Sequence, residues 1–392
     1  MSLLKQVPED MIQVLTVFQR AGFPAYLVGG CVRDLLLGRT PNDWDICTKA
    51  HPEQTMALFP RAVPTGLRHG TVTVLYGESQ TEVTTFRREG TYTDHRRPDS
   101  VCFSDDLTED LARRDFTVNA MALGLDGIVQ DPFQGQCDLE NQTLRCVGCP
   151  DRRFEEDALR MFRCLRFAAQ LGFSIEPETD AALGRHSELA RYVAPERIHV
   201  ELEKTLGSPR PEWFGKMVQL GLLDGFLPTR ETADFHCLSA LPPEPTLRWA
   251  AGCMALYRAG GLPDVGPLLT ALRLDRQTIL SVSRGVALAR EGFPETDLEI
   301  KRLLAQNDAL SVRCAAACIG ADALERAEQV LRSGDCFELK HLAVGGDDLK
   351  ARGLEGRRIG AVLHQMLDYV LAHPEENQRE RLLKLWEKGE LP

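Results

Sequence analysis

The sequence predicts an α+β fold, with a mixed β-sheet at the N-terminus and an all-helical remainder. Up to about Val147, short β-like runs alternate with turns, whereas beyond Asp151 apolar residues recur with helical spacing nearly throughout. A chain of 392 residues also exceeds one typical hydrophobic core, so we expect two to four domains.

The individual elements follow from apolar periodicity and from breaker residues. The expected strands are Ala25–Val28, Thr71–Leu75, Glu82–Phe86 and Ala120–Leu125. The expected helices are Arg152–Leu171, Pro195–Leu206, Thr246–Arg258, Arg276–Arg290, Leu298–Ala305, Val312–Leu331, Ile359–Leu371 and Pro374–Glu387. Gly172 is expected to end the first of these helices.

Composition limits the class of protein. Hydrophobic residues make up 43% and charged residues 26%, as in ordinary globular proteins. No apolar run is long enough to span a bilayer, and Met1–Asp10 shows no secretion signal, so we expect a cytoplasmic location without membrane contact. A net charge of −11 means that any binding of nucleic acid must use local basic patches.

Twelve cysteines raise the question of a metal site. Cys146 and Cys149 form one C-x-x-C pair, but a zinc site normally needs a second pair at matching spacing. Cys314 and Cys318 lie in an Ala-rich stretch that is typical of a buried helix face. We therefore interpret the cysteines as reduced structural thiols rather than as zinc ligands.

A glycine pair follows the first expected strand. Gly29 and Gly30 allow a sharp turn, and a helix is expected to begin near Cys31. Backbone N–H groups at such a turn and the helix dipole can bind an anion, and Arg33 in the first turn could reach a phosphate. Because Gly-Gly turns are common, an ordinary structural turn remains the alternative.

Two aspartates begin ten residues after Arg33, in the order Asp43-Trp44-Asp45. In a strand, residues i and i+2 point to one side, so these carboxylates would lie together and repel each other unless a cation neutralised them. Mg²⁺ prefers such oxygen ligands, and two ions can activate a hydroxyl and stabilise a pyrophosphate leaving group. Glu82 could lie beside them on a neighbouring strand. The alternatives are a solvated acidic turn and an exposed strand residue.

A second group of polar residues precedes and follows Val147. Arg114 and Asp115 could bind phosphate and a ribose hydroxyl, whereas the alternative is that Asp115 caps the following segment and Asn119 satisfies a backbone group. The polar positions Asp157, Arg160, Arg163 and Arg166 recur every three residues on the expected helix Arg152–Leu171. The alternative here is a salt-bridged surface helix in which Asp157 and Arg160 are paired.

The Asp157–Arg160 pair has a specific chemical use. Cytosine and adenine each present an amino donor beside a ring-nitrogen acceptor, which suits a carboxylate next to a guanidinium. Uracil and guanine present the opposite pattern, and they would leave buried groups unpaired at about 1–3 kcal/mol each. One Asp–Arg pair could thus select C and A without a template, while Arg163 and Arg166 hold the triphosphate.

Taken together, these motifs resemble a known family. The chain is similar to class II tRNA nucleotidyltransferases, the bacterial CCA-adding enzymes, and to the related bacterial poly(A) polymerases. The motifs that carry the resemblance are Leu27-Val-Gly-Gly-Cys-Val-Arg-Asp34, Asp43-Trp-Asp45, Glu82-Val-Thr-Thr-Phe86, Arg113-Arg-Asp-Phe-Thr-Val-Asn-Ala120 and Glu156-Asp-Ala-Leu-Arg-Met-Phe-Arg-Cys-Leu-Arg-Phe167. Their order and spacing agree over roughly the first 200 residues.

The resemblance implies a polymerase-β-like nucleotidyltransferase head followed by a helical neck, body and tail. We expect the head at residues 1–147, the neck at 148–206, the body at 207–310 and a tRNA-binding tail at 311–392. The implied activity is addition of C, C and A to the tRNA 3′ end from CTP and ATP, with Mg²⁺ as cofactor. The sequence sets no oligomeric state.

The resemblance also assigns roles to residues. It implies metal binding by Asp43 and Asp45, with Glu82 as a third catalytic carboxylate. The implied nucleotide contacts are Gly29, Gly30, Arg33, Arg114, Asp115, Asn119, Asp157, Arg160, Arg163 and Arg166. Among these, Asp157 and Arg160 correspond to the base-reading pair. The segment Glu89–Ser100 corresponds to a mobile loop that helps the family change from C to A addition.

Several rival functions remain at the level of the sequence. Enzymes that add only CC, only A, or a poly(A) tail share the same chemistry, although the chain lacks the strongly basic C-terminal extension usual in bacterial poly(A) polymerases. No His is followed by Asp, so we expect no metal-dependent phosphohydrolase domain. A D-x-D glycosyltransferase and an inactive tRNA-binding module are the remaining alternatives.

Overall fold

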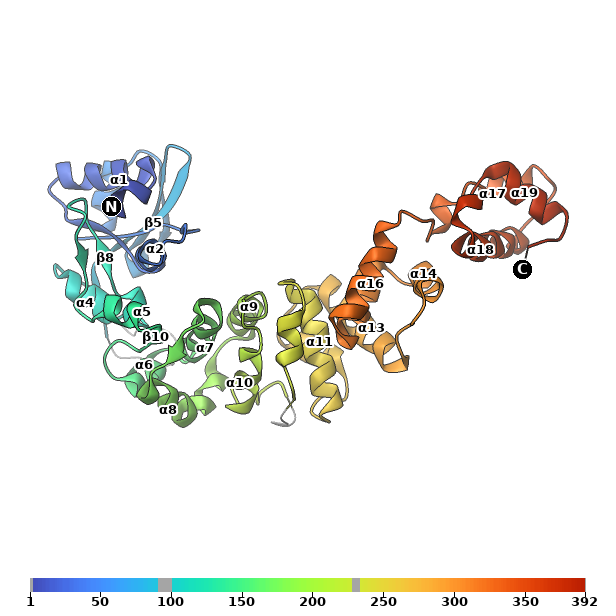
Figure 1. Ribbon diagram of the computed structural model, residues 1–392. Coiled ribbons are helices and arrows are strands. Elements are labelled where there is room, and N and C mark those ends of the chain that lie inside the picture. The colour runs from blue at the N-terminus through green and yellow to red at the C-terminus, as the bar shows by residue number, and fades with distance from the viewer. Residues whose placement is uncertain (1–2, 91–100, 228–232, 392) are drawn as a thin grey trace. The chain divides into compact units, whose positions relative to one another are not determined.

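The computed structural model describes residues 3–90, 101–227 and 233–391. The chain forms two compact units, Met1–Gly225 and Phe226–Pro392, whose elements can be followed by colour in Figure 1. The expected four-part division into head, neck, body and tail stays a prediction. Most of the loop predicted at Glu89–Ser100 lies outside the described residues. Within the described ranges, no helix is both long and apolar enough to cross a membrane.

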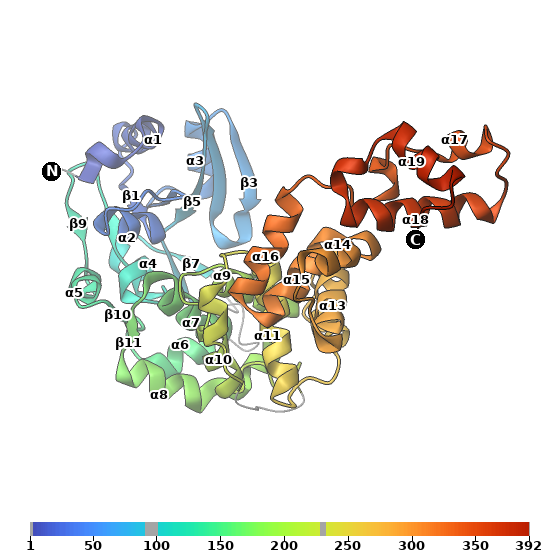
Figure 2. The same ribbon diagram turned by 45° about the vertical axis from the view of Figure 1, so that its right-hand side comes forward.

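The first unit is built around a mixed sheet, as the sequence predicts. Among the described residues, seven strands form one sheet in the order β3-β4-β5-β2-β1-β8-β9. Strands β2 and β5 are parallel, and the other neighbours are antiparallel. The strands are β1 (Ala25–Val28), β2 (Asp45–Thr48), β3 (Ala62–Gly66), β4 (Thr71–Tyr76), β5 (Ser79–Thr85), β8 (Ala122–Leu123) and β9 (Val129–Gln130). Figure 2 shows β3 and β5 at one side of this sheet.

Two small sheets accompany the large one. Antiparallel β6 and β7 form the first, and parallel β10 and β11 form the second. Their bounds are β6 (Arg87–Glu89), β7 (Val101–Phe103), β10 (Thr143–Leu144) and β11 (Ser174–Ile175). A core of Val28, Cys47, Phe86, Leu111 and neighbouring buried residues fixes the large sheet against the segment that follows β7.

Ten helices of the first unit are described. Prolines at the first helical position, which lacks an N–H partner in any case, begin α6, α8 and α9. The bounds are α1 (Glu9–Arg20), α2 (Gly30–Leu36), α3 (Pro52–Leu58), α4 (Leu107–Ala112), α5 (Gly135–Glu140), α6 (Pro150–Glu156), α7 (Leu159–Leu171), α8 (Pro177–His186), α9 (Pro195–Leu206) and α10 (Trp213–Gln219). Gly172 ends α7 at φ 77°, as expected.

The prediction of one continuous helix over Arg152–Leu171 is wrong. The helix stops at Glu156 and restarts at Leu159, because Asp157 adopts an extended conformation with φ −141° and ψ 103°. The Asp157 carboxylate then accepts a hydrogen bond from the N–H of Leu159 at 3.1 Å, as a capping residue does. The expected stripe of four polar residues on one helix therefore does not form.

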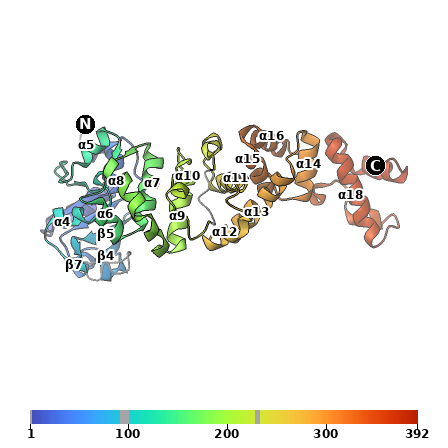
Figure 3. The same ribbon diagram turned by 90° about the horizontal axis from the view of Figure 1, so that it is seen from below.

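The second unit contains only helices among its described regular elements, as predicted. They are α11 (Pro245–Arg258), α12 (Val265–Ala271), α13 (Arg276–Glu291), α14 (Asp297–Gln306), α15 (Ala309–Ile319), α16 (Ala321–Arg332), α17 (Gly346–Lys350), α18 (Arg357–Ala372) and α19 (Arg379–Glu387). Cys314 and Cys318 lie buried on α15, which confirms their reading as core residues. Figure 3 shows α13 and α15 from below.

Two further helix predictions are corrected in this unit. The expected helix Val312–Leu331 is interrupted at Gly320, whose φ of 148° lies outside the helical region, so it forms α15 and α16. The expected helix Pro374–Glu387 begins as a 3-10 turn at Pro374–Glu376, and the α-helix starts only at Arg379. Both errors come from reading apolar periodicity across a break in the backbone.

Candidate active site

The three predicted carboxylates lie on adjacent parts of the large sheet. Asp45 is the first residue of β2, and Asp43 lies just before that strand. In the parallel pairing of β2 with β5, Asp45 stands opposite Glu82, so the expectation that Glu82 neighbours Asp45 is confirmed. All three residues are exposed. The pairing of two distant segments thus places Glu82 beside Asp45 at the start of β2.

The electrostatics of Asp45 suit a cation. Loss of hydration raises the pKa of its carboxyl, Arg114 acts in the opposite direction, and the Glu82 and Asp43 carboxylates raise the pKa further. A divalent cation would relieve this repulsion between like charges. Within the described residues, no three His, Cys, Asp or Glu side chains converge closely enough to hold a metal by themselves. Magnesium sites of this kind are completed by water and substrate phosphate.

The glycine turn brings a distant arginine to the same place. Gly29 has φ 81° and ψ −134°, a conformation that residues with a side chain rarely adopt. A Cβ atom on Gly29 would lie 3.1 Å from Nη1 of Arg114, so this glycine also makes room for the guanidinium. Arg114 is held by Asp110 at 3.3 Å, and its Nε has no partner among the described residues. Helix α2 begins at Gly30, close to the prediction.

A continuous polar chain links α2 to α7. Arg33 donates to Asp34 at 2.9 Å and to the side-chain oxygen of Asn119 at 2.7 Å. Asn119 in turn donates to Asp115 at 3.2 Å, and Asp115 accepts from Nε of Arg163 at 2.8 Å. Predicted nucleotide contacts from three separate motifs therefore form one connected network in the first unit.

Asp115 is the charged centre of this network. Burial alone would raise the pKa of its carboxyl, but the charge and hydrogen bonds of Arg163 and the hydrogen bond from Asn119 lower that pKa to about 2. Asp115 also accepts from the N–H of Phe116 at 2.9 Å. The carboxylate is thus ionised and fixed, as a group that positions neighbouring donors must be.

Three arginines surround the ring of Phe167 on α7. The guanidinium carbon of Arg166 lies 3.8 Å from the ring centroid, and those of Arg33 and Arg163 lie at 5.1 and 5.3 Å. Arg166 is buried and is bound by Glu201 and Gln170, whereas the Arg163 side chain is 34% exposed. Of Arg163 and Arg166, Arg163 is therefore the more accessible to a nucleotide.

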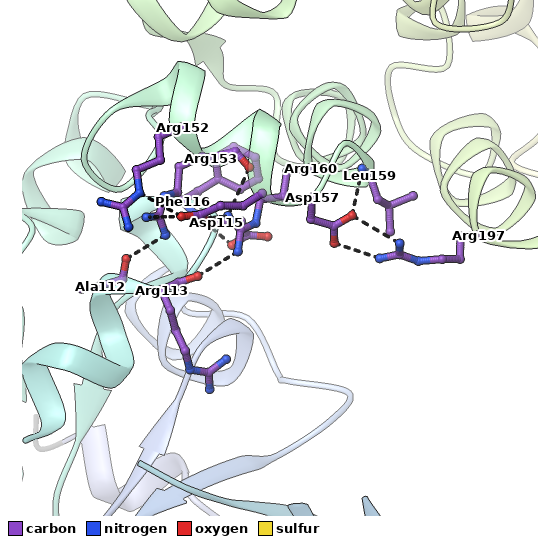
Figure 4. Close-up of polar contacts among 11 residues, drawn as sticks. Ala112, Arg113, Asp115, Phe116, Arg152, Arg153, Asp157, Leu159, Arg160 and Arg197 are labelled. Carbon is purple, nitrogen blue, oxygen red and sulfur yellow. Dashed lines mark hydrogen bonds and ion pairs between the residues drawn. The ribbon is translucent and has the colours of Figure 1, made fainter. Parts of the chain in front are cut away.

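Arg160 is occupied by contacts within the protein, some of which are drawn in Figure 4. It donates to Glu156 at 2.7 Å, to the backbone oxygen of Arg153 at 3.2 Å and to that of Arg113 at 2.9 Å. Only 8% of the residue is exposed. Arg160 thus ties α7 to the segment that carries Arg114 and Asp115.

The side chain of Asp157 does not pair with that of Arg160, so the alternative of a surface helix with an Asp157–Arg160 ion pair is wrong for this structure. The Asp157 carboxylate instead accepts from Arg197 of α9, at 3.2 and 2.9 Å, as Figure 4 shows. The break after Glu156 explains this change, because the extended backbone of Asp157 directs its carboxylate to Arg197. The backbone oxygen of Asp157 still accepts from the N–H of Arg160 at 2.9 Å.

Sequence reasoning missed several residues that hold the site. Asp110 binds both Arg113 and Arg114, Arg197 binds Asp157, and Glu201 binds Arg166. Arg197 and Glu201 are separated by four residues on α9, so they share the face that meets α7. That spacing of opposite charges was the signal available in the sequence, but it does not name the partners across the helix interface.

Two regions of the chain match known families. Residues 25–145 match the poly(A) polymerase head domain, and residues 172–233 match a region described as the probable RNA and SrmB-binding site of polymerase A. The CCA-adding enzyme of Geobacillus kaustophilus is 36% identical over 394 residues, covering 95% of each chain. The chain belongs to the CCA-adding enzyme family. Membership implies use of a divalent metal ion and removes the D-x-D glycosyltransferase as an explanation of Asp43 and Asp45.

Other relatives agree with this assignment. The CCA-adding enzyme of Limosilactobacillus fermentum is 39% identical, over 95% of this chain and 94% of that one. A crystal structure of the Bacillus stearothermophilus enzyme in complex with CTP matches with a TM-score of 0.75 at 30% identity, covering 97% of both chains. The Thermotoga maritima CCA-adding enzyme complexed with tRNA has a TM-score of 0.69 at 20% identity, which supports the fold alone.

Proposed function

We propose that this protein adds C, C and A to the 3′ end of tRNA, using CTP and ATP and releasing pyrophosphate. The observation that carries the proposal is the polar network from α2 to α7, together with the carboxylates at the start of β2, in a chain whose relatives are CCA-adding enzymes over nearly their full length. The substrates named for those relatives, tRNA and CTP, are the ones that we assign to this chain.

Asp43 and Asp45 would hold the divalent cation, and we propose Mg²⁺ because hard carboxylate oxygens are its preferred ligands. When bound, the ion supplies activation of the tRNA 3′-hydroxyl and stabilisation of the leaving pyrophosphate. Glu82, opposite Asp45, adds negative charge that strengthens cation binding. The pKa of Asp45 is raised because loss of hydration and repulsion by the neighbouring carboxylates disfavour its ionised form. A bound cation would offset this repulsion, which supports the proposed role.

The glycine turn and the arginines would bind the rest of the nucleotide. Gly30 presents its N–H group at the start of α2, where a triphosphate can be bound, whereas the Gly29 N–H donates to the backbone oxygen of Met121 at 3.3 Å. Arg33 and Arg114 lie beside that turn. Asp115, which accepts from Asn119, orients Arg163 and would accept from a ribose hydroxyl. Arg166 and Arg163 both lie against the ring of Phe167.

Asp157 and Arg160 would select the base. Asp157 is held by Arg197 and Arg160 by Glu156, so each side chain is oriented by a partner of opposite charge. Cytosine and adenine match a carboxylate acceptor beside a guanidinium donor, whereas uracil and guanine do not. Base selection therefore requires both groups to direct hydrogen bonds at the incoming nucleotide.

The incorporation of labelled nucleotides tests the proposal and separates it from its nearest rivals. Three tRNAs lacking CCA, CA or A are incubated with CTP, with ATP or with both. A complete CCA enzyme extends all three to the same end. Arrest after CC, addition of A alone, or a long adenosine tail would identify a CC-adding enzyme, an A-adding enzyme or a poly(A) polymerase instead.

The Asp43→Ala variant tests the metal assignment. We expect it to abolish incorporation while tRNA binding largely survives, because the carboxylate acts on the reacting atoms and not on the tRNA body. Asp126→Ala, which removes an exposed carboxylate to which we assign no role, serves as a control and should retain incorporation. Full incorporation by Asp43→Ala would reject the assignment. The proposal includes a cytoplasmic location, where tRNA and nucleoside triphosphates are available.

A further inference from the structure

A second polar cavity lies in the first unit, away from the carboxylates on β2. It has a volume of about 470 Å³, within the range of small-ligand sites. Its wall is formed by residues 141–142, by residues 172–175 around β11, by Asp180 of α8 and by Arg210, Trp213 and Lys216 at α10. We call this the β11–α10 cavity, and its elements can be located in Figure 2.

An aromatic ring and two cations share one side of this cavity. The guanidinium carbon of Arg210 lies 5.7 Å from the centroid of the Trp213 ring. Lys216, one helical turn after Trp213, lies 3.5 Å from Asp180, a long ion pair between half-exposed side chains. Arg210 is likewise half-exposed and bonds Glu212 at 3.0 Å. These exposed pairs are weak, so both cations can turn toward an anionic ligand at little cost.

The same wall carries unsatisfied hydrogen-bonding capacity. The indole N–H of Trp213 is buried and has no acceptor among the described residues. Such a donor costs on the order of 1–3 kcal/mol, so an oxygen brought into the wall would be favoured there. Asn141 and Gln142 are exposed at the rim and can offer amide donors and acceptors.

We propose that the β11–α10 cavity binds one unpaired ribonucleotide. The ring of Trp213 can stack on the base, and the Asp180 carboxylate can accept from the ribose hydroxyls. Arg210 and Lys216 can bind the phosphate. The inference rests on the proposed function in taking RNA as the substrate. Eight of the ten lining residues also lie within 172–233, the region that matches an RNA-binding family. The nucleotide is either part of the bound tRNA or free in solution.

Charge reversal and loss of the aromatic ring test the proposal in the full chain. The binding of tRNA lacking CCA is measured by fluorescence anisotropy at several salt concentrations. If the nucleotide belongs to tRNA, Lys216→Glu lowers the slope of log Kd against log salt by about one. Trp213→Leu raises Kd roughly tenfold or more through lost stacking. Because Trp213→Leu also affects packing, Lys216→Glu at a half-exposed position provides a second variant that is less dependent on folding.

A matched control is Arg20→Glu, which makes the same charge change at an exposed residue of α1 outside this cavity. It should leave the salt slope and the incorporation of CMP and AMP unchanged. Equilibrium dialysis with AMP and with deoxy-AMP then tests the free nucleotide. Loss of one bound AMP per chain in Lys216→Glu, with weaker binding of deoxy-AMP to the wild type, would identify a free ribonucleotide as the ligand.

Two results would overturn the inference. The first is that Lys216→Glu and Trp213→Leu both keep the wild-type affinity for tRNA and the wild-type number of AMP molecules bound per chain. The other is an equal loss of tRNA affinity in Arg20→Glu, which would indicate a general charge effect. Failure of the proposed function is distinguishable, because it would appear as no CCA incorporation by the wild-type protein, whereas these binding measurements would still report on the cavity.

Discussion

At the scale of single residues, Asp115 shows how charge holds the site. It is buried, yet Arg163 and Asn119 keep it ionised and lower its pKa to about 2. Asp115 connects the segment after α4 with α7, so its charge stabilises the junction between the sheet and the helices. Removing one partner of a buried ion pair leaves the other charge uncompensated, which is usually costly.

We therefore expect Asp115→Asn to lower the free energy of unfolding by about 2 kcal/mol at pH 7. Because the pKa of Asp115 is lower in the folded state, its contribution is fully present above the unfolded-state pKa and is lost as the pH falls through the folded-state pKa. The difference between wild type and variant, measured by urea unfolding, should thus shrink from about pH 4 toward pH 2. Asp347→Asn, at a fully exposed carboxylate, should change stability little. A difference that grew on acidification would contradict the ion pair.

Asp157 combines two roles that substitutions can separate. It caps α7 through the N–H of Leu159, and its charge binds Arg197. Asp157→Asn keeps an oxygen for the cap but loses the charge, so it should weaken the preference for CTP over UTP with a small loss of stability. Asp157→Ala should lose the preference for CTP over UTP. Its free energy of unfolding should be about 1 kcal/mol lower than that of Asp157→Asn. The measurements are kcat/KM for both nucleotides and thermal unfolding. Equal discrimination in all three proteins would remove Asp157 from base selection.

At the scale of elements, breaks between helices decide where side chains point. The single helix predicted over Arg152–Leu171 is two helices in the structure. At the two-residue break between them, the Asp157 carboxylate forms its ion pair with Arg197 and not with Arg160. In the second unit, close packing has a similar effect. A Cβ atom on Gly285 of α13 would clash with the Cβ atom of Cys314 on α15. It would also lie only 3.0 Å from the backbone N of Ala315. The two helices can cross this closely only because the residue is glycine.

Gly285→Ala should therefore lower stability by about 1–3 kcal/mol through overpacking between α13 and α15. The matched control is Gly252→Ala in α11, where a Cβ would meet nothing within 4 Å. That change should stabilise the protein by up to about 1 kcal/mol, because alanine favours the helix. Chemical unfolding of both variants gives the comparison. A neutral Gly285→Ala would mean that α13 and α15 separate at little cost.

At the scale of the whole molecule, every residue that we assign to catalysis or nucleotide binding lies in Met1–Gly225. This unit has its own sheet, its own core, the network from Arg33 to Arg163 and the ion pair between Asp157 and Arg197. The second unit has a separate core that includes Val344, Leu349 and Met366. The division suggests that nucleotide selection and part of the RNA binding are carried by different units.

We expect a fragment of residues 1–225 to fold and to bind CTP in preference to UTP. Its affinity for tRNA should fall at least tenfold relative to the full chain, because the predicted tRNA-binding tail at 311–392 is missing. Circular dichroism checks folding, and titration calorimetry with each nucleotide and with tRNA gives the affinities. Unchanged tRNA affinity would show that the second unit is not needed for binding.

The sequence by itself determined the fold class, the positions of several strands and of the longer helices, and the residue types of the site. Local signals were sufficient for these, because Ala25–Val28, Pro195–Leu206 and the end of α7 at Gly172 depend on periodicity, proline and glycine. Only the tertiary structure decided which of these side chains lie next to each other. The pairing of Asp45 with Glu82, Asp157 with Arg197 and Arg166 with Glu201 joins residues 35 to 40 positions apart. Such contacts depend on how helices and strands pack, and no short-range pattern in the sequence specifies that packing.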